Sequence, residues 1–490
     1  MPKDAFSQAF LPPLEADPGR PRDGSIPYPS GMRILQKLAF GLVPSFLQPR
    51  LRPTPPKPHL HPTSYLDGLR GIASFIVMMG HYTEENLGWY TEPYGLYENG
   101  APSSPLQLPF VRVIYSARPM VHIFFIISGY VLSYKPLKQI HSQQYAALAT
   151  TLSSSVFRRG IRLFLPSIVT LFIMALAVYY GLSDPRYASP FLSLSLQLSH
   201  WWSTCWELLW ASWAINDLSY PQPVYNPALW TIPVEFAQSL LLFIVILGLS
   251  RCLTNIRLLI LSCVIAFCFH TGELYAVEFL GGMFIAEVTL LQNRSLLSPT
   301  SSPTVLPKYV LDEKPEKPKC VPTIKQKLIE AFWIANVICG LFIASWTNNH
   351  VEEVWGLRFL NAHTPEPYSG QRVWFCLGAF QIVVACTQVR CLQNIFNTHI
   401  AQYLGNISYA LYLTHNLCLT ILEPRMLPLL DSYFAKDTFW GRQINWLAGL
   451  VLYLPIIICV ADLFWRAVDM PTVKFARWVE AKCIVTPKKT

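Results

Sequence analysis

Long apolar runs recur along this 490-residue chain from residue 65 onward, and they limit its possible folds more than any other feature. A transmembrane helix needs about 20 mostly apolar residues. Ten segments approach this requirement: 66–82, 119–135, 161–181, 234–250, 257–271, 275–291, 328–346, 373–390, 403–422 and 444–465. Some are short or carry polar residues, which would have to face the inside of a bundle. The runs therefore predict an all-α fold, a polytopic bundle of about ten transmembrane helices.

Composition supports a membrane protein over a soluble one. Charged residues make up 14% of the chain and hydrophobic residues 52%, whereas soluble domains average roughly 25% charged residues. The 12 cysteines include no C-x-x-C pair and lie mostly in apolar runs, so neither a disulfide framework nor a metal site is predicted. The net charge of +9 is modest for this length and indicates membrane orientation, with no nucleic-acid partner.

The distribution of basic residues predicts the orientation of the bundle. The segment 292–327 carries seven lysines and arginines, whereas 83–118 and 347–372 carry glutamates. Because cytoplasmic loops are enriched in Lys and Arg, ten spans with both termini in the cytosol suit all of these loops. An eleventh span at Trp201–Ile215 would place 292–327 outside. We therefore interpret that tryptophan-rich stretch as an interfacial or re-entrant piece.

The prolines, the apolar runs and the basic residues together divide the chain into three predicted regions. Residues 1–62 hold 14 of the 40 prolines and are expected to form a mostly disordered cytosolic tail. Residues 63–475 form the membrane domain, which includes the cytosolic loop 292–327. Residues 476–490 are expected to be a basic cytosolic tail.

The first predicted span carries the densest set of chemically useful side chains. Arg70 and His81 are eleven residues apart, so a helix places both on one face, about 16 Å from each other. Asp67 lies three residues before Arg70 and joins this stripe. Charged groups inside a membrane are costly and usually functional, so the three are candidate catalytic residues. Alternatively, Asp67 and Arg70 flank the span and His81 caps its far end.

Basic and acidic residues near two other spans are further candidates. Arg158, Arg159 and Arg162 stand at the predicted cytosolic start of the third span. They suit a phosphate site, because arginine binds phosphate in a bidentate manner, but topology alone also predicts them. Glu235 is expected at or just inside the outer interface, where the fourth span begins.

Two small polar motifs complete the set of candidates. Ser128 and Gly129 lie in an aromatic run of the second span, where small residues suit close helix packing. No G-x-S-x-G motif surrounds Ser128, so a hydrolase triad is not predicted. In the ninth span, Ser408 and His415 share a face with Tyr412, and Tyr409 follows Ser408. His415 is a second candidate for catalysis or substrate positioning, although a single intramembrane histidine often only joins helices.

Together these segments resemble the acyltransferase-3 family of polytopic membrane acyltransferases over roughly residues 64–470. The resemblance rests on L-D-x-L-R-G followed by His81, F-F-x-x-S-G-Y at 124–130, and the basic pattern at 158–162. It also rests on W-T-x-x-x-E at 230–235 and L-G-x-I-S-Y-x-L-Y-L-x-H at 404–415. Many members continue the glutamate motif as E-x-x-F-Y, and this chain departs from that pattern after Glu235.

The resemblance implies transfer of a short acyl group, such as acetyl, from acyl-CoA to a hydroxyl of a small-molecule acceptor. Acyl-CoA (acetyl-CoA) then acts as a co-substrate, and no bound cofactor is expected. It also implies catalytic roles for His81, Arg70 and Asp67, and a CoA-phosphate role for Arg158, Arg159 and Arg162. Glu235, Ser408, Tyr409 and His415 would support the acceptor.

The proline-rich leader and the long 292–327 loop are similar to the fungal branch, whose members often act on secondary metabolites. This similarity implies a multi-pass protein of the endoplasmic reticulum or endomembranes. Other functions fit the same residues: O-acylation of a glycan, a multi-pass transporter in which Arg, His and Glu line the path, or a transporter-like scaffold without catalysis. No internal repeat links the two halves, which disfavours the transporter.

Overall fold

The computed structural model describes residues 43–45, 47–48, 60–96, 103–183, 188–211, 223–297, 324–368, 370–434 and 438–484. Contacts divide the chain into two units, Met1–Pro55 and Pro56–Thr490. All helices discussed below belong to the second unit. The tail predicted for residues 1–62 lies almost wholly outside the described residues.

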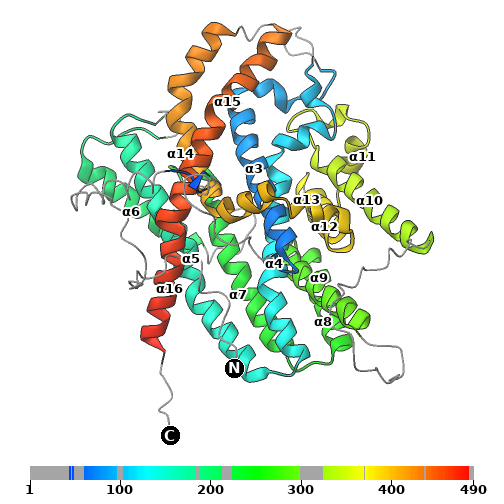
Figure 1. Cartoon of the computed structure of the whole chain (residues 1–490). Helices are drawn as coiled ribbons and strands as arrows, with labels where there is room; N and C mark the ends of the chain where they lie inside the picture. Colours follow the sequence, from blue (N-terminus) through cyan, green and yellow to red (C-terminus); the bar gives the residue numbers. More distant parts are fainter. Residues whose placement is uncertain are drawn as a thin grey trace, which may run out of the picture. The chain divides into compact units, whose positions relative to one another are not determined.

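The described part of the chain is all-helical and contains no strand (Figure 1). Its longer helices are α3 (Ser64–Asn86), α4 (Ala117–His141), α5 (Tyr145–Tyr179), α6 (Leu194–Trp210), α7 (Thr231–Leu249), α8 (Thr254–His270), α9 (Leu274–Leu297), α10 (Ile324–Ala344), α12 (Arg372–Gln388), α14 (His399–Tyr433), α15 (Phe439–Phe464) and α16 (Met470–Cys483). The shorter elements include α11 (Leu357–Ala362), α13 (Arg390–Phe396), the 3-10 helices η1 (Gly88–Thr91), η2 (Pro105–Gln107), η3 (Val111–Tyr115), η5 (Pro227–Trp230) and η6 (Val351–Glu353), and the π-helical turn η7 (Trp465–Asp469).

Each of the ten predicted segments overlaps one helix: α3, α4, α5, α7, α8, α9, α10, α12, α14 and α15. By length and composition, six helical stretches of the described chain can cross a membrane, or seven if the bent pair α12–α13 counts as one span. The helix α8 is apolar but shorter, and α3 and α14 are not among the six. Several apolar helices thus support an integral membrane protein, and α3 and α14 are the helices that carry most of the candidate polar residues.

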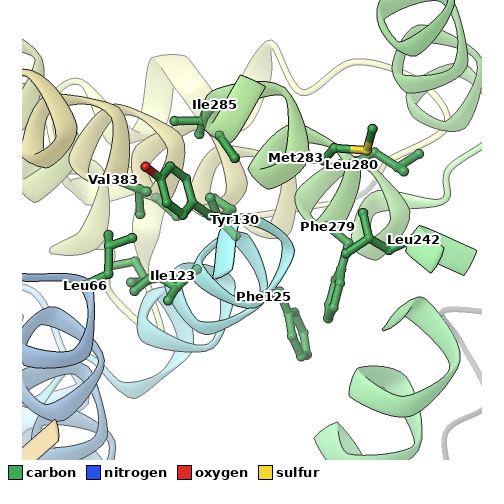
Figure 2. Packing of buried hydrophobic residues seen from close by; sticks show 14 of the residues in the cluster. Leu66, Ile123, Phe125, Tyr130, Leu242, Phe279, Leu280, Met283, Ile285 and Val383 are labelled. Carbon is green, nitrogen blue, oxygen red and sulfur yellow. The ribbon is translucent and has the colours of Figure 1, made fainter. Parts of the chain in front are cut away.

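The main core surrounds α4, which contacts α3, α5, α7, α9 and α12. Figure 2 shows Ile123 and Phe125 of α4 among apolar side chains of neighbouring helices, including Leu66 of α3 and Phe279 of α9. At Gly129 of α4, an added Cβ would lie 2.1 Å from the carbonyl oxygen of Phe279. A glycine here allows α4 and α9 to approach at backbone distance.

The helices α3 and α14 also approach at backbone distance. An added Cβ on Gly71 would lie 2.3 Å from the backbone nitrogen of Gly405, and one on Gly405 would lie 2.5 Å from the carbonyl oxygen of Asp67. The Ser74 hydroxyl donates to the carbonyl of Ser408 at 2.8 Å across the same contact. This glycine contact fixes the two helices that carry His81 and His415.

The structure differs from the sequence prediction at α5. This helix begins at Tyr145, sixteen residues before the predicted span, so Arg158, Arg159 and Arg162 lie in its middle and not at its start. Residues 145–160 are too polar to register as a span, yet Ala, Leu and Arg are good helix formers. The predicted loop 136–160 is therefore only a short turn between α4 and α5. Similarly, α16 crosses the predicted boundary at residues 475 and 476.

The stretch interpreted as interfacial begins as α6, and residues 212–215 lie outside the described residues. Trp202, Trp206 and Trp210 are exposed at spacings of four residues, so they form one stripe of the helix. The opposite side buries Cys205 and Leu208. Exposed indoles on one face suit a helix at the membrane surface.

Candidate active site

Arg70 and Asp67 lie at the beginning of α3, beside α14. The Nε of Arg70 donates to the hydroxyl of Ser408 at 3.0 Å, and one terminal nitrogen lies 3.2 Å from Asp67. The Arg70 and Asp67 side chains are 38% and 49% exposed, so this ion pair contributes little to stability. Its accessible guanidinium is instead suited to binding an anion.

His81 lies three turns further along α3 and also faces α14. Its ring centroid is 5.0 Å from that of His415, with the planes tilted by 41°. The Nδ1 of His415 lies 3.1 Å from the carbonyl oxygen of Leu411, and a carbonyl can only accept, so Nδ1 carries the proton. The Nε2 of a neutral His415 then has a lone pair. Because His415 is fully buried and His81 is half-buried, His81 is the more accessible of the two.

A second polar network anchors α14 next to His415. The Tyr412 hydroxyl donates to the carbonyl of Ala228 at 2.7 Å, so its side chain faces η5. The Asn416 amide donates to the side-chain oxygen of Asn226, whose own amide donates to the carbonyl of Leu413. Asn226 has no exposed surface. These bonds join α14 to Asn226 and η5 next to His415.

Arg159 and Glu235 form an ion pair between α5 and α7, and Arg159 also donates to the hydroxyl of Ser239 at 3.1 Å. From the sequence, Arg159 is expected at the cytosolic interface and Glu235 at the outer one, so this contact contradicts the expected position of at least one of them. The expectation fails because α5 starts earlier than predicted, which places Arg159 well inside the helix. Both side chains are mostly buried, at 14% and 16% exposure.

The other two arginines of α5 have different surroundings. The Nε of Arg158 lies 3.1 Å from Glu480 of α16, whereas Arg162 is exposed. Asp469 at the end of η7 interacts electrostatically with both Arg162 and Arg70. The structure therefore brings the arginines of α5 and the Asp67–Arg70 pair to the same region.

Ser408 and Tyr409 point in different directions from α14. Ser408 faces α3, whereas the Tyr409 hydroxyl donates to the carbonyl of Leu163 on α5 at 2.7 Å. Gly129 packs against α9, and Ser128 is half-buried. The candidates thus form one row along α3 and α14 and a second row along α5 and α7.

Asp469, Asn226 and Glu84 lie beside these residues but are not among the site residues predicted from the sequence. Asp469 follows the last predicted span, and the Asn-Pro dipeptide at Asn226 marks a turn, so both had only weak local signals. Glu84 lies one turn beyond His81 and interacts with it electrostatically. Burial raises the pKa of the Glu84 carboxyl, whereas nearby Arg118 and the Asn348 amide favour its ionised form.

Comparisons with known proteins agree with this architecture. The profile of a family described as an acyltransferase domain, acyltransferase-3, matches residues 63–466. The O-acetyltransferase PaAT-1 of Phomopsis amygdali is 28% identical over 468 residues, covering 88% of this chain and 87% of that protein. The acyltransferase clz18 of Cochliobolus lunatus is 25% identical, covering 86% and 96%. The acyltransferase R4 of a Phoma species is 26% identical, covering 84% and 94%.

No solved structure matches the chain. The family match covers most of the sequence, including both histidine helices and the arginine-rich part of α5. The three fungal relatives each match over nearly their full length. The chain therefore belongs to the acyltransferase-3 family and is an acyltransferase of its fungal-type branch.

Proposed function

We propose that this protein is a membrane O-acyltransferase that moves an acetyl group from acetyl-CoA to a hydroxyl of a small-molecule acceptor in secondary-metabolite biosynthesis. The observation that carries the proposal is the pair His81 and His415, joined across the contact between α3 and α14. The name of PaAT-1, an O-acetyltransferase, supports acetyl as the group transferred. We place the protein in the endoplasmic reticulum or endomembranes, with ten spans and both termini in the cytosol.

His81 is the general base in this proposal. A hydroxyl is a poor nucleophile at neutral pH, and a histidine side chain can accept its proton during attack on a thioester. The new O–C bond forms as the C–S bond breaks, and the proton then passes from His81 to the departing thiolate. His415 supports His81, because the two rings lie close together and the Nδ1 of His415 is already held by the carbonyl of Leu411.

Arg70 binds the donor and does not polarise the reacting carbonyl. Eleven residues of helix separate it from His81 by about 16 Å, which is too far for both to contact one thioester. The long pantetheine arm of CoA can span this separation, with its phosphates near Arg70 and its thioester near His81. Asp67 and Ser408 orient the guanidinium.

The three arginines of α5 divide into two roles. Arg162 is exposed, so it is available to a CoA phosphate. Arg158 and Arg159 are paired with Glu480 and Glu235, so they mainly hold α5 against α16 and α7 and add positive potential around Arg162. The hydrogen bond from the Tyr409 hydroxyl to the carbonyl of Leu163 also holds α14 against this part of α5.

The proposal is tested by offering purified protein in lipid nanodiscs acetyl-CoA together with a panel of alcohols. Free CoA thiol and the acetyl ester should appear in equal amounts, and both should depend on His81. Direct transfer and an acyl-histidine intermediate are separated by labelled CoA, because only the intermediate exchanges label with acetyl-CoA when no acceptor is present. Release of no thiol with any alcohol would contradict acyl-CoA as the donor.

A further inference from the structure

A polar cavity opens beyond the end of α3 that carries His81. It has a volume of about 390 Å³ and lies among the end of α10, η6, α11 and the beginning of α12. Its lining includes Trp346, Thr347, Asn348, Asn361, Gln371 and Arg372. Ligand sites commonly measure roughly 300–1,000 Å³, so this cavity can hold a small molecule.

The Thr347 hydroxyl is an independent sign of a ligand. Thr347 is only 3% exposed and lines the cavity. Its oxygen has no hydrogen-bond partner among the described residues. A buried hydroxyl without a partner is costly, and such groups usually bond to something that fills the site.

The cavity is connected to the candidate active site through Asn348. Its side-chain amide hydrogen-bonds with the carboxylate of Glu84, which in turn interacts with His81. The backbone nitrogen of Asn348 also donates to the carbonyl of Thr91, so this wall is fixed to η1. Asn348 and Glu84 therefore lie between a molecule in the cavity and His81 on α3.

The lining indicates the chemical class of the ligand. Besides His350, Glu352 and Arg372, the lining has threonine, asparagine and glutamine side chains, which both donate and accept hydrogen bonds, as hydroxyl groups do. A molecule with several hydroxyls can pair with many of them at once, whereas an apolar molecule would leave them unpaired. The donor arginines lie near the opposite end of α3, so the cavity is not part of the proposed acyl-CoA site.

We propose that this cavity admits the acceptor, a compact polyhydroxylated molecule, so that acceptor and acyl donor approach His81 from opposite ends of α3. The inference rests on the proposed function for the identity of the ligand as acceptor. The existence of the site can be tested without catalysis.

The experiment measures the melting temperature of purified protein with myo-inositol and with cyclohexanol, which have the same six-carbon ring but six hydroxyls and one. A ligand that binds only the folded state raises the melting temperature. We expect inositol to do so in a concentration-dependent, saturable way and cyclohexanol not to. Polyols also stabilise proteins without binding, and cavity variants measure that background.

Thr347→Val removes the hydroxyl while keeping the shape of the side chain. Because this hydroxyl has no protein partner, the variant should be as stable as the native protein, yet its apparent inositol affinity should fall about 2- to 12-fold, the value of one hydrogen bond. Asn361→Leu at the exposed rim should reduce binding further. Thr271→Val is the matched control, because Thr271 is exposed and its hydroxyl bonds only within its own helix region.

His81→Ala separates this inference from the proposed chemistry. The variant should lose acetyl transfer but keep the inositol-dependent rise in melting temperature. If inositol gives the same rise in native protein, Thr347→Val and Asn361→Leu, the cavity is not a binding site, whatever the activity assay shows. If inositol binds through the cavity but His81→Ala retains full transfer, the site stands and the proposed mechanism fails.

Discussion

The ring centroids of His81 and His415 lie 5.0 Å apart, although 334 positions separate the two residues in the chain. His81 is half-buried, whereas His415 is fully buried and its Nδ1 donates to the carbonyl of Leu411 in its own helix. In the proposed mechanism the pair therefore acts unequally: His81 meets the substrates, and His415 acts on His81.

His81→Ala should abolish acetyl transfer without loss of folded, membrane-inserted protein. A general base typically contributes about 10²–10⁴-fold to the rate. His415→Gln should lower kcat less and leave the KM for acetyl-CoA unchanged, because His415 acts through His81. The measurement is thiol release from protein of verified melting temperature. Activity of His81→Ala within about threefold of native would remove this residue from the mechanism.

Arg162→Ala should mainly raise the KM for acetyl-CoA, because it removes a contact that is made equally in the ground and transition states. Arg70→Lys keeps the charge but loses the planar fork and the Nε bond to Ser408, so it should raise the same KM. Ser128→Ala is the control and should leave both constants nearly unchanged. Unaltered acetyl-CoA affinity in Arg162→Ala and Arg70→Lys would leave the donor site elsewhere.

Arg159→Ala should destabilise the protein, because Glu235 would keep a mostly buried charge without its partner. Breaking such a pair costs about 3–5 kcal/mol. The double variant Arg159→Leu with Glu235→Leu should recover most of this loss, because apolar side chains can replace a buried ion pair. Melting temperatures of the single and double variants decide the matter. Equal destabilisation by the double variant would mean that packing around α5 and α7, and not charge pairing, is responsible.

Gly71→Ala should destabilise the contact between α3 and α14, because its Cβ would lie 2.3 Å from the backbone of Gly405. Forcing extra atoms into a packed contact typically costs about 1–3 kcal/mol. Gly248→Ala on α7 is the matched control, since nothing lies within 4 Å of its Cβ. It should be neutral or stabilise the helix by about 1 kcal/mol. Equal melting temperatures for both variants would contradict the tight contact.

Tags after Met1, within 300–320 and after Thr490 should all report the cytosol, and a tag within 347–372 should report the opposite side. This outcome follows from the positive-inside rule applied to ten spans. Protease protection and glycosylation of inserted acceptor sites are the measurements. A tag within 300–320 on the far side would require another span, for which α6 is the first candidate.

Apolar segments predicted the helices well because hydropathy is a local property of sequence. The early part of α5 escaped because hydropathy does not detect a polar helix. That omission also misplaced Arg159 relative to Glu235. The stripe of Asp67, Arg70 and His81 follows from helix geometry alone. Its partners on α14 could be identified as candidates by pattern, but which side of α14 each one faces depends on packing between residues 338 and 246 positions apart.

The glycine contact between α3 and α14 has a consequence for engineering this enzyme. Because backbone lies against backbone there, the histidine-bearing helices have little freedom to adjust to a new substrate. Attempts to change the acceptor by substitutions along this contact should mostly yield unfolded protein. If the proposed cavity admits the acceptor, libraries directed to its lining residues should alter acceptor selectivity while the proposed reactive centre keeps its shape.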